Sequence, residues 1–189
     1  MMGDLHDGLG LHLATALRQA RMASAARDPL VSTLQDCLDD LRVAIDSLDE
    51  QERDPLALLG SLRFRMAPRF ESMGLHLGWE VGPDLGELPQ LDAAGALDLL
   101  RIVQEALGNA LKHSGADRVS MALQRTADGT LVTVLDNGVG FDPALATAGR
   151  GTGTMRARAR RLGAQLEWQR LDPGTAVTLL LPDPPSQAA

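Results

Sequence analysis

Three stretches decide the fold of this chain: RIVQEALGNALKHS at 101–114, DNGVGFD at 136–142 and GRGTG at 149–153. The first has the spacing of an amphipathic helix, with Val103 and Ala110 on its apolar side. The second directly follows the apolar run LVTVLD, and the third leads into another region of helical pattern. A helix with a polar face, followed by two glycine-rich loops, predicts an α/β fold with a ligand-binding site.

Length, composition and charge exclude several classes of function. The 189 residues suffice for one ordinary domain and a smaller helical piece. A net charge of −7, an aromatic content of 3% and the lack of Tyr argue against nucleic acid as a partner. The single cysteine, Cys37, excludes an internal disulfide and fits a reducing, cytoplasmic compartment. No apolar run approaches the roughly 18 residues of a membrane span, so we expect no membrane contact by this segment. Any sensor that crosses a membrane would lie outside this sequence.

The front of the chain predicts a helical hairpin. Leucines recur every fourth residue from Leu5 to Leu17, and a heptad seam runs from Leu34 to Leu48. Pro29 fits the first position of the second helix. A hairpin alone buries too little apolar surface, so we expect residues 1–52 to form a dimeric four-helix bundle. Docking of both stripes on the rest of the same chain is the alternative.

Residues 53–183 predict a two-layer α/β sandwich, with a mostly antiparallel sheet and helices on one face. The alternation of Leu75, Leu77, Trp79 and Val81 indicates a strand whose His76 is exposed. Asp128-Gly129 predicts a hairpin turn. Residues 184–189 are expected to be a disordered tail. The expected helices are 56–73, 93–113 and about 153–162, and the expected strands are 75–81, 119–123, 131–136, 164–170 and 176–181.

The helix at 93–113 carries a polar face. Glu105 and Asn109 are four residues apart and Lys112 is three further, so the three side chains stack on one side. An amide and a carboxylate together suit Mg²⁺, which takes oxygen ligands and shares them with phosphates and water. Lys112 and His113 add donors for those phosphates. Taken alone, this face is better explained as a solvated one.

The glycine loops change that interpretation. Asp136 ends a strand, and its carboxylate can accept a hydrogen bond from an exocyclic amine such as that of adenine. Gly138 and Gly140 allow positive φ angles and close approach of the backbone to a planar ligand. Gly149, Gly151 and Gly153 precede the expected helix start, where backbone N–H groups favour phosphate. Neither a Walker A loop nor a dinucleotide fingerprint is present. Together, the three elements predict bound ATP.

The order NALKH, DNGVG and GRGTG resembles the N, G1 and G2 boxes of the GHKL (Bergerat-fold) ATPases. The opening DLHDGLG at 4–10 narrows the resemblance to histidine kinases of the DesK/NarX type. The likeness covers nearly the whole chain. It implies an Mg²⁺ ligand at Asn109, with Glu105 assisting at the metal or water, and an adenine-binding carboxylate at Asp136. It further implies that Lys112 and His113 lie beside the phosphates, and that Gly138 and Gly140 shape the floor under the nucleotide. Gly151 and Gly153 would anchor a lid, formed by residues 143–150, over the phosphates.

The same resemblance makes His6 the phosphoryl acceptor. Imidazole, with a pKa of about 6.5, is largely neutral and nucleophilic at pH 7. Asp7 can accept from Nδ1–H and leave Nε2 free to attack. Without the ATP boxes, an exposed polar pair would be the better interpretation. Only five residues precede His6, which predicts a shortened chain or a parent that starts elsewhere.

We therefore expect a protein-histidine kinase that phosphorylates itself and passes the phosphoryl group to an aspartate of a response regulator. Two alternatives remain: an ATP-binding dimer module or phosphatase without useful autokinase activity, and another GHKL member such as a serine kinase or chaperone-type ATPase. The arginines at 156, 158, 160 and 161 form a basic run, for which a solvated helix face is favoured over contact with phosphate or with the hairpin.

Overall fold

A computed structural model of the chain describes residues 55–85, 88, 91–141 and 150–183. The expected hairpin with His6 and Asp7, the lid at 143–149 and the tail at 184–189 lie outside the described residues. All described residues belong to one compact unit, Gln51–Ala189. Within this part of the chain, no helix has both the length and the apolar character needed to cross a membrane.

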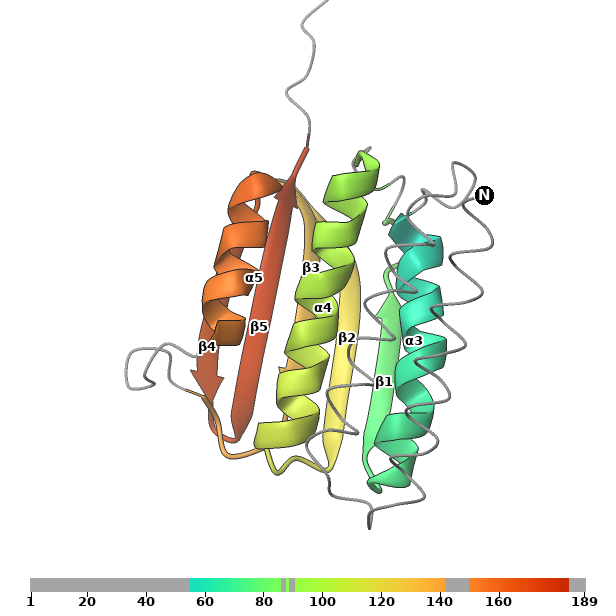
Figure 1. Cartoon of the computed structure of the whole chain (residues 1–189), viewed down its shortest axis with the longest axis vertical. Coiled ribbons are helices and arrows are strands. Elements are labelled where there is room, and N and C mark those ends of the chain that lie inside the picture. The colour runs from blue at the N-terminus through green and yellow to red at the C-terminus, as the bar shows by residue number, and fades with distance from the viewer. Residues whose placement is uncertain (1–54, 86–87, 89–90, 142–149, 184–189) are drawn as a thin grey trace, which may run out of the picture. The chain divides into compact units, whose positions relative to one another are not determined.

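The described residues form a two-layer α/β sandwich. Its five-stranded sheet has the order β1-β2-β3-β5-β4, in which β1 is parallel to β2 and every other neighbouring pair is antiparallel. Three helices cover one face of this sheet (Figure 1). The predicted mostly antiparallel sheet with helices on one side is thereby confirmed. The elements are α3 (Pro55–Ser72), β1 (His76–Val81), α4 (Ala93–His113), β2 (Arg118–Thr126), β3 (Gly129–Asp136), α5 (Arg150–Arg161), β4 (Gln165–Leu171) and β5 (Gly174–Pro182).

The core lies between the helices and the sheet. Alternate residues of β2 point toward the helices and are fully buried, as are Phe70 of α3 and Leu107 of α4. Burial of such side chains contributes about 1.5–3 kcal/mol each. The apolar side of α4 expected from the sequence is confirmed, because Val103, Ala106 and Ala110 are all buried.

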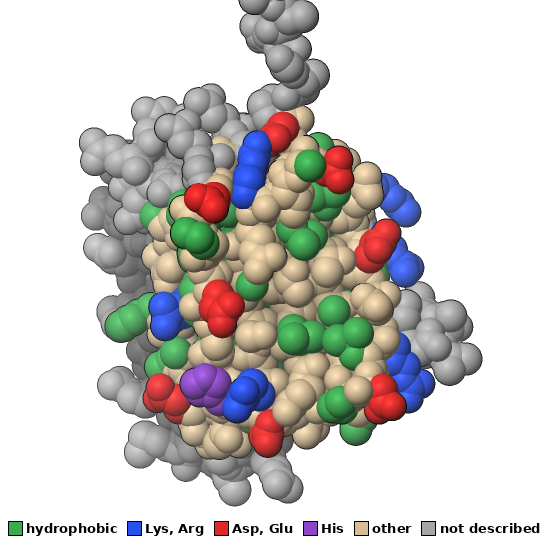
Figure 2. Space-filling model, turned by 180° about the vertical axis from the view of Figure 1, so that it is seen from behind, with side chains coloured by type: hydrophobic (Ala, Val, Ile, Leu, Met, Phe, Trp, Pro, Cys, Tyr) green, Lys and Arg blue, Asp and Glu red, His purple; other side chains and the backbone are tan. Residues whose placement is uncertain are grey.

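The opposite face of the sheet is not covered by any helix of the described part of the chain. Figure 2 shows this face, on which hydrophobic side chains are interspersed with charged ones. His76 is exposed as expected. Val81, in contrast, is 51% exposed although it continues the apolar alternation of β1. It is the last residue of an edge strand, so neighbours surround it on fewer sides.

The ends of α4 are fixed by side chains. Asp92 caps its start by accepting a hydrogen bond from the backbone N–H of Gly95 at 2.7 Å. Such a cap contributes about 1 kcal/mol. At the other end, the Ser114 hydroxyl donates to the carbonyl of Ala110 and accepts from the N–H of Ala116. The Ala110 carbonyl also accepts from the backbone N–H of Ser114, so Ser114 bonds to the last turn of α4 through both its backbone and its side chain.

The start of α5 differs from the expectation. The helix begins at Arg150 rather than near 153, so Gly151 and Gly153 lie in its first turn and not in a loop before it. Glycine weakens a helix by roughly 0.5–1 kcal/mol relative to alanine. Packing outweighs this cost here, because Met155 and Ala159 of the same helix are buried. A β-carbon on Gly151 would also collide with the Glu105 carboxylate of α4.

One buried carboxylate joins α4 to α5. Both oxygens of Asp98 accept hydrogen bonds from the Arg161 guanidinium, at 2.8 and 2.6 Å, and Arg158 lies 3.7 Å away. The side chain of Asp98 is 12% exposed and that of Arg161 is 61% exposed. The hydrogen bond with Asp98 raises the pKa of Arg161 further above its ordinary value. The solvated face expected for the arginine run agrees with the exposure of Arg156, Arg160 and Arg161, while Arg158 and Arg161 in addition contact Asp98.

We predict that Asp98→Ala lowers the free energy of unfolding by about 1–3 kcal/mol, because two charge-assisted hydrogen bonds are lost. Asp84→Ala, in an exposed turn, is the matched control and should change stability by less than about 0.5 kcal/mol. Urea denaturation of the full chain measures both variants. Equal stability of the two would show that the Asp98–Arg161 pair does not hold the helices together.

Candidate functional site

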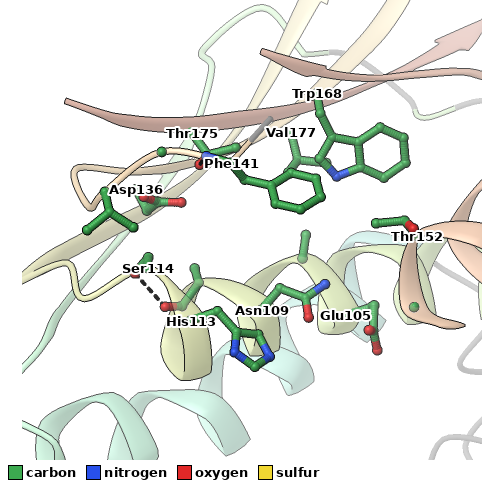
Figure 3. A pocket seen from close by; sticks show the side chains of 15 residues that line it. Glu105, Asn109, His113, Ser114, Asp136, Phe141, Thr152, Trp168, Thr175 and Val177 are labelled. Atoms are coloured by element: carbon green, nitrogen blue, oxygen red, sulfur yellow. Dashed lines mark hydrogen bonds between the residues drawn. The ribbon is translucent and has the colours of Figure 1, made fainter. Parts of the chain in front are cut away.

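A cavity of about 440 Å³ opens between α4 and the sheet. Its size falls in the range of small-molecule sites in proteins, about 300–1,000 Å³. Figure 3 shows α4 on one side of the cavity and the strand residues on the other, with the start of α5 at one end. The lining residues are Glu105, Ala106, Asn109, Ala110, His113, Ser114, Asp136, Val139, Gly140, Phe141, Gly151, Thr152, Trp168, Thr175 and Val177.

The polar face of α4 contributes Glu105, Asn109 and His113 to the cavity. Each is four residues from the next, which keeps the three side chains on one side of the helix. Glu105 and Asn109 are half-buried, and His113 is exposed. Lys112 is exposed and does not line the cavity, so of the two phosphate donors expected on this helix His113 alone borders it.

Asp136 lies at the end of β3, on the other side of the cavity from α4 (Figure 3). It is 7% exposed, and its Oδ1 accepts a hydrogen bond from the N–H of Gly138 at 2.9 Å. This bond fixes the carboxylate within the turn that follows the strand. An ionised carboxylate has acceptor capacity beyond a single bond, so Asp136 can still receive a donor from a ligand.

The turn after Asp136 is tied to the end of α4 and to the loop that follows it. Asn137 Oδ1 accepts from the N–H groups of Asp117 and Arg118, at 3.2 and 3.0 Å. The N–H of Val139 donates to the carbonyl oxygen of Ser114 at 2.9 Å. These bonds join β3, the turn and the C-terminus of α4 into one unit beside the cavity.

The two glycines of this turn have different roles. A β-carbon on Gly138 would overlap with the backbone carbonyl of Ser114, so only glycine permits this approach. Gly140 has a φ of +79°, which L side chains rarely adopt. Gly140 lines the cavity and Gly138 does not. The close approach that Gly138 permits in this structure is to the chain's own backbone.

Thr175 is a site residue that the sequence analysis missed. It is 6% exposed, pairs with Asp136 across the β3–β5 ladder and lines the cavity. Its hydroxyl accepts a hydrogen bond from the N–H of Phe141 at 2.9 Å. Phe141, Trp168 and Val177 were missed as well. Trp168 and Val177 are partners in the β4–β5 ladder, so only the strand register could have brought them to the same cavity.

The first turn of α5 closes one end of the cavity through Gly151 and Thr152. The first N–H groups of a helix lack partners within it and favour anions. The Glu105 carboxylate lies beside Gly151. Gly153 is exposed and does not line the cavity, so of the two glycines expected to anchor a lid, Gly151 alone borders it.

The donors of the cavity fit a magnesium ion that is shared with a phosphate ligand. Among the described residues, no group of three or more His, Cys, Asp and Glu side chains could hold a metal by itself. Asn109 and Glu105 nevertheless supply an amide and a carboxylate oxygen from adjacent turns of α4. Mg²⁺ is commonly bound by one or two such groups, with waters and substrate phosphates completing its shell.

Comparison with known proteins shows which families have a similar sequence. Residues 94–185 match the family described as histidine kinase-, DNA gyrase B-, and HSP90-like ATPase. The chain is 28% identical over 179 residues to the nitrate/nitrite sensor protein NarX of Escherichia coli, covering 90% of this chain and 30% of NarX. It is 26% identical over 191 residues to the oxygen sensor histidine kinase NreB of Staphylococcus carnosus, covering 95% of this chain and 54% of NreB.

Solved structures show the same fold. The histidine kinase domain of an Erythrobacter litoralis blue-light activated histidine kinase aligns with a TM-score of 0.55 at 19% identity, over 93% of this chain and 95% of that one. The Acinetobacter baumannii histidine kinase AdeS aligns with a TM-score of 0.59 at 14% identity, over 92% and 94% of the two chains. Residues 94–185 therefore carry the match to the histidine kinase-, DNA gyrase B-, and HSP90-like ATPase family, on a Bergerat-type fold, and the chain is similar in sequence to the NarX-type sensor histidine kinases.

Proposed function

We propose that this chain is the autokinase core of a two-component signalling system, with His6 as the phosphoryl acceptor. The observation that carries the proposal is the polarity of the cavity. A buried carboxylate, Asp136, lies at one end, while Asn109, Glu105 and the first turn of α5 lie toward the other. An adenine nucleotide has the matching polarity, with an amine donor on its base and anionic phosphates at its far end.

The chain's own residues would orient the nucleotide. Asp136 accepts a hydrogen bond from the adenine amine, and Gly140 and Val139 border the base. The N–H groups at the start of α5 would lie beside the phosphates. Lys112 and His113, at the C-terminal end of α4, would supply further donors to the ligand. Asn109 and Glu105 would hold Mg²⁺, which would neutralise charge on the phosphates. Catalysis then depends on position and charge compensation.

The transfer step joins the γ-phosphorus of ATP to Nε2 of His6. The bond between that phosphorus and the bridging oxygen breaks, and ADP leaves with the electron pair. Asp7 accepts from Nδ1–H and keeps the attacking nitrogen unprotonated. Passage of the phosphoryl group to an aspartate carboxylate of a response regulator completes the proposed sequence. The heptad seam from Leu34 to Leu48 supports a homodimer through the hairpin.

We predict that Asn109→Ala weakens Mg-ATP binding at least tenfold, a loss of about 1.4 kcal/mol, because an oxygen ligand of the metal is removed. Gln104→Ala, on α4 but outside the cavity lining, is the matched control. Calorimetric titration of each full-length variant with ATP, with and without Mg²⁺, measures the effect. Unchanged affinity in Asn109→Ala would exclude Asn109 as a metal ligand.

We predict that γ-labelled ATP transfers its label to the chain, that the label is acid-labile, and that His6→Gln abolishes it while ATP still binds. Acid lability is expected because a phosphoryl group on an imidazole nitrogen hydrolyses readily at low pH. His12→Gln is the matched control and should retain labelling. Label that persists in His6→Gln would place the acceptor elsewhere. A chain that binds ATP without any labelling would instead be an ATP-binding module or phosphatase.

A further inference from the structure

Trp168 contributes an indole ring to the nucleotide cavity from β4, the edge strand of the sheet. Along β4, Leu166 and Trp168 are half-buried, whereas Glu167 and Gln169 between and after them are exposed. Trp168 therefore lies on the side of the strand that faces the helices. Its ladder partner Val177 lines the same cavity, so the indole is part of a continuous apolar wall.

Arg156 of α5 holds this indole from the helix side. Its guanidinium carbon lies 4.9 Å from the centroid of the Trp168 ring. That distance is within the range of about 6 Å for a cation–π interaction. Of the neighbouring arginines, Arg158 and Arg161 are engaged by Asp98, whereas Arg156 pairs with no carboxylate among the described residues. Arg156 contacts the Trp168 ring instead. Because the guanidinium covers one face of the ring, the indole has less freedom to rotate.

A second aromatic ring continues the wall. Phe141 follows the turn after β3, and its backbone N–H is fixed by the Thr175 hydroxyl. Figure 3 shows Phe141 and Trp168 on the sheet side of the cavity, opposite Asn109 and Glu105, with Trp168 closer to Thr152 of α5. The whole chain has only three Phe and two Trp, and this one cavity contains one of each.

We propose that Trp168 is a nucleotide-contacting residue against which the ribose of ATP packs, and that Arg156 is the positioning residue that holds its indole in place. The proposal rests on the proposed function, since it needs ATP in this cavity. Flat aromatic side chains bind bases and ribose through their contact area and need no hydrogen bonds to do so. Because Arg156 belongs to the helix whose first turn borders the cavity, the pair also couples the nucleoside wall to the phosphate end of the site.

Tryptophan fluorescence tests the contact directly. The other tryptophan, Trp79, lies on β1 at the opposite edge of the sheet, so Trp79→Phe leaves Trp168 as the only indole without touching the cavity. In this variant, titration of the full chain with Mg-ATP should change the emission of Trp168 until it saturates. The dissociation constant from this titration should equal the one that calorimetry gives. Trp168→Phe, which retains Trp79 alone, should show no change. Emission of Trp168 that stays constant while calorimetry reports binding would overturn the proposal.

Affinity tests both residues. Trp168→Leu should weaken Mg-ATP binding about tenfold, and Trp168→Phe less, because phenyl keeps part of the stacking surface. Arg156→Gln should weaken binding about threefold and alter the emission of Trp168 in the free protein, and Arg156→Lys should restore both, because an ammonium also binds a ring face. Arg160→Gln, exposed on the same helix, should match the unaltered chain.

Two controls separate the possible failures. Thermal melting of each variant should stay close to that of the unaltered chain, which excludes loss of folding as the cause. An unaltered chain that binds no ATP would contradict the proposed function itself. An unaltered chain that binds ATP, together with unchanged affinity in Trp168→Leu and Arg156→Gln, would overturn only the inference about the aromatic wall.

Discussion

The site depends on one constraint: the backbone at and after Asp136 packs directly against two other segments of backbone. Gly138 packs directly against the carbonyl of Ser114 at the end of α4, and Gly174 at the start of β5 packs directly against the carbonyl of Asp136. Neither contact tolerates a β-carbon. The hydrogen bond from Val139 to Ser114 closes the first of them. The end of β3 is thus held between α4 and β5, and the Asp136 carboxylate has a fixed position beside the cavity.

The positions of the other site residues follow from the regular geometry of the helices. The α-helical repeat carries the polar face of α4 from His113 through Asn109 to Glu105 along the cavity. The Asp98 carboxylate joins α4 to the last turn of α5, and the first turn of α5 lies against Glu105. A site with an acceptor at one end and a helix N-terminus at the other is the physical basis for the proposed orientation of ATP.

Local patterns predicted much of this molecule. The alternation in β2 and the 3.6-residue period of α4 indicated the right elements. DNGVG and NALKH contained six of the residues that line the cavity: Asn109, Ala110, His113, Asp136, Val139 and Gly140. Long-range pairing could not be predicted in the same way. Thr175, Val177 and Trp168 enter the cavity only because β5 pairs with both β3 and β4 in a particular register. The early start of α5 at Arg150 likewise depends on packing against Glu105 and on buried Met155, which outweigh the glycines' low helix propensity.

Base selectivity is the most direct test of the account, because it depends on the orientation of the nucleotide relative to Asp136. The full chain and Asp136→Asn should be titrated with ATP and with GTP in the presence of Mg²⁺ by calorimetry. The account predicts that the unaltered chain binds ATP and discriminates strongly against GTP, whose carbonyl oxygen would face the carboxylate in place of an amine. It also predicts that Asp136→Asn loses affinity for ATP and most of this discrimination. Equal binding of the two nucleotides by the unaltered chain, or no effect of Asp136→Asn, would contradict it.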